Sequence, residues 1–134
     1  MAPKAERVEQ ISIFLKNRAG VVADLCTALT EQHINIRALT VMDTVDVGTL
    51  RMVVDDVELA KTALGNTGAA YIIVPVVALA IENAPGAFAR VARTMAQAGV
   101  NIEYVYASAI GGSERSLGIF RVNNVEKALS LTYA

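Results

Sequence analysis

The sequence predicts an α+β protein built from two similar βαββα units in tandem, the second without a clear last strand. Three observations support this fold class. Residues 17–36 repeat at 83–102 with five identities at a constant offset of 66. Both copies carry apolar residues at i, i+3, i+4 and i+7, the pattern of an amphipathic helix. A second pair of segments, 54–58 and 122–126, matches at an offset of 68. The whole unit therefore occurs twice.

The first strand of each copy is predicted at 10–15 and at 76–81. A fourth strand of the first copy is predicted at 71–74, so that two strands meet at Pro75. The second copy has only residues 131–134 after its last helix, so its fourth strand is missing or minimal. Either the chain is truncated there, or the open sheet edge is covered by another chain, because exposed edges invite pairing.

An Asn-x-x-Gly turn opens the first helix of each copy, at residues 17–20 and 83–86. The helices are expected to end at His33 and at Gly99. Glycine is the usual residue in the left-handed position just past a helix end, so His33 is predicted to adopt that conformation. The apolar stripes are Val22, Leu25, Cys26 and Leu29 in the first copy and Phe88, Val91, Ala92 and Met95 in the second.

Two β-rich runs joined by turn-forming residues follow each first helix and predict a hairpin. The four strands are predicted at 35–42, 49–54, 101–108 and 116–122. A second helix follows each hairpin, and its start resembles a capping box, with Asp55 or Asn123 as the capping residue three positions before a glutamate. The two units are therefore expected at 9–75 and 76–134.

Composition excludes several classes of protein. The 134 residues are 54% hydrophobic, carry a net charge of −1 and contain no long run of one charge. A protein that binds nucleic acid or an acidic membrane by its charge is therefore not expected. The uncharged segment 68–81 is too short for a membrane helix, which needs about 20 apolar residues. Cys26 is the single cysteine, and no export signal precedes the fold, so a cytoplasmic location is expected.

The element order, the doubled turn and the apolar-Asn-apolar start of the next strand resemble the ACT domain family over roughly residues 9–131. The best match joins 82–86 (Glu-Asn-Ala-Pro-Gly) to 100–102 (Val-Asn-Ile), whereas 16–20 lacks the proline. The resemblance implies two ferredoxin-like βαββαβ units that pair, side by side or in a homodimer. It also implies a small effector, often an amino acid, bound where two units meet. No cofactor or metal is expected. Since no catalytic or DNA-binding domain is attached, the regulated partner is expected to be a separate protein, such as an enzyme, unless the module simply binds its amino acid.

The turn before each first helix is the predicted ligand site. Its glycine lets the backbone approach a ligand, and the first-turn amides favour a carboxylate. Asn17 and Asn83 are candidate acceptors for an ammonium group, although each is equally well explained as a helix cap. Asn35 and Asn101 lie between apolar neighbours where asparagine is disfavoured, which favours ligand contact over a turn role. The predicted ligand-binding residues are Asn17, Ala19, Gly20, Val21, Val22, Asn35, Asn83, Pro85, Gly86, Ala87, Phe88 and Asn101.

The two turns differ in charge. Lys16 and Arg18 flank the first, whereas Glu82 and Ala84 flank the second. The two sites are therefore not expected to be equivalent, and one is expected to dominate.

No catalytic constellation can be assembled from the sequence. His33 is the only histidine, and the sequence contains no HExxH, GxSxG or CxxC motif. We therefore predict an amino-acid sensor and not an enzyme. The alternative is an oligomerisation module without a ligand. A sensor gains thermal stability with its amino acid, because a ligand that binds only the folded state stabilises it.

Overall fold

The structure, a computed structural model, describes residues 3–16, 18–43 and 47–133. In chain order its elements are β1 (Ala5–Lys16), α1 (Val21–Glu31), β2 (Ile36–Asp43), β3 (Val47–Val54), α2 (Val57–Thr67), β4 (Ala70–Glu82), α3 (Ala87–Gln97), β5 (Ile102–Ser108), β6 (Arg115–Val122) and α4 (Val125–Ser130). Hydrogen bonding orders the strands β2-β3-β1-β4-β6-β5. β3 is antiparallel to β1 and β2, and β6 is antiparallel to β4 and β5. The predicted α+β class is confirmed.

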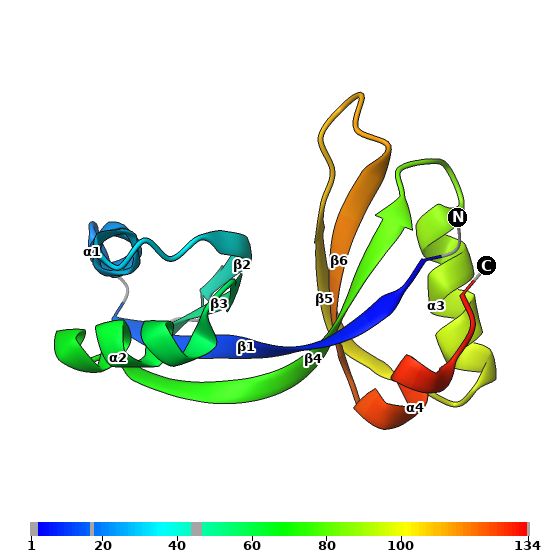
Figure 1. The fold of residues 1–134 in the computed structure, drawn as a ribbon. Coiled ribbons are helices and arrows are strands. Elements are labelled where there is room, and N and C mark those ends of the chain that lie inside the picture. Colours follow the sequence, from blue (N-terminus) through cyan, green and yellow to red (C-terminus); the bar gives the residue numbers. More distant parts are fainter. Residues whose placement is uncertain (1–2, 17, 44–46, 134) are drawn as a thin grey trace. The chain divides into compact units, whose positions relative to one another are not determined.

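The chain forms two compact units. The first unit is Glu9–Val74, and the second comprises Pro75–Ala134 together with the described part of Met1–Val8. β1 and β4 contribute residues to both (Figure 1). Our expected unit boundaries, 9–75 and 76–134, stay a prediction.

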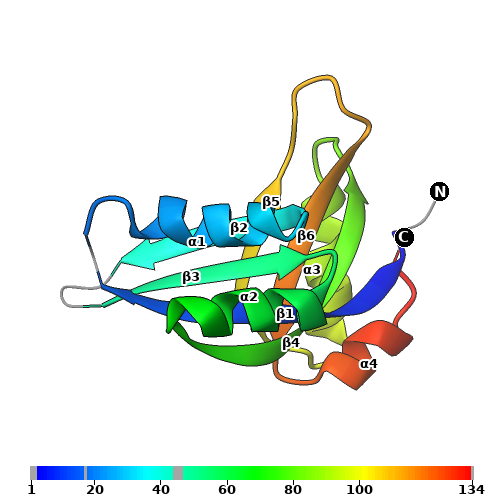
Figure 2. The same cartoon turned by 60° about the vertical axis from the view of Figure 1, so that its left-hand side comes forward.

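The first unit has the strand order β2-β3-β1-β4, and α1 and α2 cover one face of this sheet (Figure 2). Alternate residues of β1 and β3 point to that face, as the two-residue period of a strand requires. They pack against the buried stripes of the two helices. The buried core residues are Ile11, Ile13, Leu15, Leu25, Leu29, Ile34, Leu50, Met52, Val54, Ala60, Ala63 and Leu64.

The second unit has the order β1-β4-β6-β5, with α3 and α4 supplying the helical side of its core. Its core residues are Val77, Leu79, Ile81, Ala87, Val91, Met95, Val100, Phe120, Val122, Val125, Ala128 and Tyr133. No strand follows α4 in the described residues, as predicted. The place beside β4 is taken by the start of β1. Ala5 packs on this core, and Arg7 pairs with Glu126 at 3.2 Å. Residues at the start of β1 therefore lie at this edge of the second unit.

β4 corrects one prediction. Residues 71–74 and 76–81 were expected as two strands meeting at Pro75, but Ala70–Glu82 is one continuous strand. The strand passes through the proline without a break: Tyr71 and Ile73, both half-buried, pack on the core of the first unit, and the buried Val77 belongs to that of the second. Nη1 of Arg121 donates to the Pro75 carbonyl at 2.9 Å, so this carbonyl is satisfied.

The ends of the first helices agree with the prediction. His33 has φ 57° and Gly99 has φ 76°, both in the left-handed region. In each unit the next amide closes the turn, Ile34 N donating to Leu29 O at 3.1 Å and Val100 N to Met95 O at 2.9 Å. Histidine therefore performs the role for which glycine is better suited.

The N-cap of each second helix lies one residue later than predicted. Asp56, and not Asp55, caps α2 by accepting from Leu59 N at 3.0 Å. Asn124 caps α4 in the same way, accepting from Lys127 N at 3.0 Å. The residues predicted as caps bind the preceding junction instead, as described below.

Candidate functional site

Each first helix begins at a glycine in the left-handed conformation, Gly20 with φ 90° before α1 and Gly86 with φ 84° before α3. Neither position supplies a side-chain cap. The partial positive charge of the first-turn amides is therefore not balanced by a capping side chain. Asp24 adds an acidic side chain to the first turn of α1.

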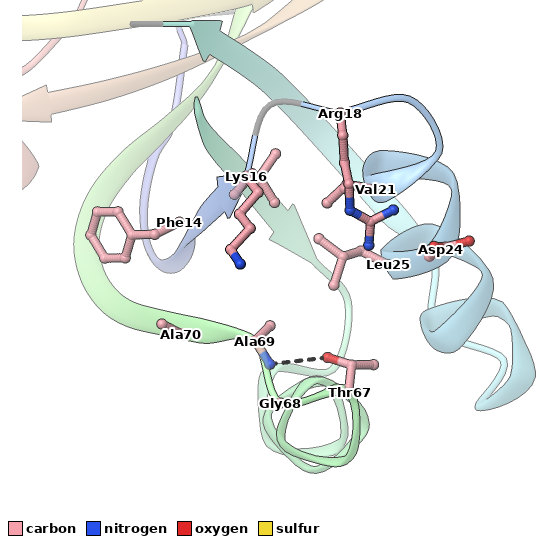
Figure 3. Close-up of a pocket in the computed structure, with 11 residues that line it drawn as sticks. Phe14, Lys16, Arg18, Val21, Asp24, Leu25, Thr67, Gly68, Ala69 and Ala70 are labelled. Atoms are coloured by element: carbon pink, nitrogen blue, oxygen red, sulfur yellow. Dashed lines mark hydrogen bonds between the residues drawn. The ribbon is translucent and has the colours of Figure 1, made fainter. Parts of the chain in front are cut away.

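A cavity of about 470 Å³ lies in the first unit beside the start of α1 (Figure 3). Three segments line it: the end of β1 with the following turn, the first turns of α1, and the turn from α2 to β4. The lining residues are Phe14, Leu15, Lys16, Arg18, Val21, Asp24, Leu25, Thr67, Gly68, Ala69 and Ala70. Thr67 Oγ1 accepts from Ala69 N at 3.3 Å, which fixes the turn that forms the far wall. The walls are mostly apolar, and the charges are few.

Three charged side chains line this cavity, Lys16, Arg18 and Asp24. All three are exposed. Within the described residues none of them forms an ion pair. Figure 3 shows the Lys16 ammonium directed toward the turn 67–70 and the Arg18 guanidinium beside Val21 and Leu25. The cavity therefore offers two cations and one carboxylate that no described side chain neutralises.

The second unit carries different charges at the matching positions. At the repeat offset of 66, Lys16 corresponds to Glu82 and Asp24 to Arg90. Glu82 and Arg90 pair with each other at 3.7 Å. The Arg90 guanidinium lies close over the helix start, since a Cβ on Gly86 would be 3.3 Å from its Nη1. The start of α3 is thus approached by a side chain of its own helix.

Asn83 has a structural role that differs from the predicted helix cap. Its Nδ2 donates to the carbonyls of Ser113 at 3.0 Å and Ile110 at 3.4 Å, and its backbone amide donates to Glu114 O at 2.9 Å. It therefore holds the loop between β5 and β6. A polar hollow of about 430 Å³ is lined by Glu82, Asn83, Glu114 and Arg115.

The other predicted residues of the second turn divide between surface and core. Pro85 is exposed, and Ala87 is buried in the core of the second unit. Phe88, predicted on the buried stripe, is 41% exposed and stacks on Phe120 with ring centroids 5.6 Å apart. In the first unit Ala19 is exposed in the turn, and Val22 lines a smaller hollow of about 110 Å³. Asn17 lies outside the described residues.

Asn35 and Asn101 lie at the opposite ends of their helices from the glycines. The eleven residues of α1 span about 16 Å, so one small ligand in the first unit does not reach both Gly20 and Asn35. The Asn35 backbone makes two hydrogen bonds with Asp55. Its amide donates to Asp55 Oδ1 at 3.0 Å, and its carbonyl accepts from the Asp55 amide at 3.1 Å. Asn101 and Asn123 do the same at 2.9 and 3.1 Å. Ligand contact by these two side chains stays a prediction.

Sequence reasoning missed the wall formed by residues 67–70. No motif identifies these residues, because they meet the turn after β1 only through the neighbouring position of β4 in the sheet. Glycine at 68 and the uncharged run that follows are the only local signals.

Other kinds of site receive little support. None of the helices in the described ranges is long and apolar enough to cross a membrane. Nor do three or more His, Cys, Asp or Glu side chains gather as metal ligands in the part of the chain that the structure describes. Burial raises the pKa of the Cys26 thiol, which favours the protonated form over the reactive thiolate.

The doubled fold is that of a known class of protein. A family model described as an ACT domain pair matches residues 6–132, and the chain belongs to this family. The two predicted ferredoxin-like units in tandem are thereby confirmed.

Individual solved structures resemble the chain along most of its length. Protein BT0572 from Bacteroides thetaiotaomicron is 34% identical, with a TM-score of 0.86 over 93% of this chain and 85% of that one. The ligand-free regulatory subunit of aspartate kinase from Thermus thermophilus is 20% identical, with a TM-score of 0.71 over 96% and 93%. Escherichia coli aspartokinase III in complex with lysine and aspartate is 12% identical, with a TM-score of 0.57 over 96% of this chain and 31% of that one. The curated proteins include no match.

Proposed function

We propose that this protein is an amino-acid-binding regulatory protein whose effector binds in the cavity of the first unit. One observation carries the proposal: the cavity combines apolar walls with Lys16, Arg18 and Asp24, none of them paired within the described residues. Its volume of about 470 Å³ lies in the usual range of small-molecule sites. Membership of the ACT domain pair family supports the same function.

The expected pose follows from the chemistry of the lining. Arg18 binds the α-carboxylate beside the uncapped first turn of α1, since an arginine and helix amides both favour an anion. Asp24 accepts from the ammonium group. The aliphatic part of the ligand packs on Val21 and Leu25.

Binding regulates, in this proposal, because the ligand has different affinities for two arrangements of the protein and shifts the population between them. The protein itself catalyses no reaction, and the enzyme that it regulates is a separate chain. His33 supports this, since the only histidine of the sequence is used at a helix end. We further propose that the protein works in the cytoplasm as a homodimer.

A thermal melt of the full chain against the twenty amino acids tests the function. A ligand at a hundredfold excess over its Kd adds about 2.7 kcal/mol to the stability of the folded state, which raises Tm by several degrees. Arg18→Gln should reduce the rise produced by the active amino acid. Arg93→Gln, which neutralises an exposed arginine of α3, is the matched control and should leave it unchanged.

The alternative is an assembly module without a ligand. β2 and β5 are the two end strands of the hydrogen-bonded order, and end strands offer free backbone groups for pairing. Under this alternative no amino acid shifts Tm, while sedimentation still shows a stable dimer. That pair of results would refute the proposed function.

A further inference from the structure

We infer that the cavity of the first unit selects an acidic amino acid, a ligand with two carboxylates and one ammonium group. This inference rests on the proposed function and names its ligand class. It comes from the charge balance of the lining and not from the helix start alone.

The charged lining of the cavity carries a net charge of +1. Lys16 and Arg18 supply two positive charges and Asp24 one negative charge, and the remaining lining residues carry none. Among the described residues, a neutral amino acid would leave one of the two cations without a counter-ion beside apolar walls. An acidic amino acid gives each of the three charges an opposite partner, and a basic one adds a repulsion.

The two cations approach the cavity from different points of one segment. Lys16 is the last residue of β1, and Arg18 lies in the turn that follows. Figure 3 shows their charged ends directed to different parts of the cavity, one toward the turn 67–70 and one beside Val21. Two separated cations suit a ligand whose two carboxylates are separated by its carbon chain.

The second unit supplies an internal comparison. Its matching positions hold Glu82, Ala84 and Arg90, whose charges sum to zero, and the two charged residues pair with each other at 3.7 Å. An excess of positive charge at the helix start is therefore a property of the first unit. We expect one acidic amino acid per chain.

Calorimetry on the full chain tests the ligand class with two matched pairs of probes. L-glutamate and L-glutamine have nearly the same shape and differ by one charge, as do L-aspartate and L-asparagine. At low ionic strength, whichever of the two acidic amino acids is the tighter ligand should bind about tenfold more tightly than its amide, with one site per chain. The reason is that a charge-assisted hydrogen bond contributes more than a neutral one. Because the cations are exposed, the ratio should fall as salt is added.

Two variants assign the selectivity to its residues. Lys16→Gln and Arg18→Gln should each lower the acid-to-amide ratio toward one, whereas Arg93→Gln should keep it. An amide that binds as tightly as its acid would overturn the inference and leave the proposed function standing. A ratio that survives in both variants would overturn the inference too, and with it the placement of the effector in this cavity, because the acid would then be recognised elsewhere. If none of the twenty amino acids binds or raises Tm, the proposed function fails together with the inference.

Discussion

The junction between the first helix and its hairpin gives the sharpest test of which asparagines are structural. In the first unit the Asp55 side chain accepts from the Asn35 amide at 3.0 Å, and in the second unit Asn123 accepts from Asn101 at 2.9 Å. We therefore expect Asp55→Ala to destabilise the protein, while Asn35→Ala, which keeps every backbone hydrogen bond at this junction, should be close to neutral.

The magnitude follows from the number of hydrogen bonds removed. Asp55→Ala deletes one accepted bond at an exposed site where water can replace it, and such a bond contributes about 1 kcal/mol net. Asp56→Ala removes the true N-cap of α2 and should cost a further 1 kcal/mol or so, about the usual value for a cap. The two bonds have different donors, so independent sites would give a loss of about 2 kcal/mol in the double variant, and a departure from that sum measures the coupling of these adjacent residues.

Urea unfolding followed by circular dichroism measures these differences directly, and in a chain of this size 1 kcal/mol corresponds to about 3–5 °C in Tm. Asn123→Ala is the matched variant in the second unit and should behave as Asp55→Ala does. A silent Asp55→Ala together with a destabilising Asn35→Ala would refute the reasoning. If Asn35→Ala is stable but loses the shift in Tm produced by an amino acid, its side chain contacts the ligand as the sequence predicted.

Three further predictions concern stability. His33→Gly should raise the free energy of unfolding by about 0.5–1 kcal/mol, because glycine accepts the left-handed conformation without strain. Gly99→Ala should lower it by about 1 kcal/mol. If urea titrations show that both variants change the free energy of unfolding in the same direction, this reasoning is contradicted. Asn83→Ala should cost about 1–2 kcal/mol and speed amide exchange in the loop 110–114, which loses two donated bonds; unchanged exchange there would count against the assigned role. Burial raises the pKa of Tyr133 above its ordinary 10.0, so the unfolded state ionises first and stability should fall as the pH rises past 10; in Tyr133→Phe the urea midpoint should fall less over that range, and an equal fall would refute this.

The sequence predicted those features that its repeat carries locally. The hairpins, the first helices and the unusual backbone of His33 all follow from matching each residue to its counterpart 66 or 68 positions away. It did not predict the last strand of the second unit, because Ala5 is a small residue among charged ones and gives no hydrophobic signal. Pro75 was taken as a break since proline lacks an amide, yet the strand continues through it.

The candidate site was predicted in part. The glycine turn was identified, but the chemistry of the cavity depends on Lys16 and Arg18, which entered only as flanking charges, and on the wall at 67–70. Asn83 shows why the remainder could not be found. An asparagine before a helix is equally suited to a cap, a ligand contact or a loop anchor, and only the position of the β5–β6 loop decides between them.

In the second half of the chain, the repeated stretch of sequence and the compact structural unit are not the same. Residues from the start of β1 complete the second unit. A contiguous gene segment encodes the first unit, but no contiguous segment encodes the second, whose edge is made from residues near Ala5. The whole first unit therefore lies between this edge strand and the rest of the second unit along the chain. A cut at Pro75 divides the sequence into its repeats, but it also takes from the second one a strand that its own repeat does not encode.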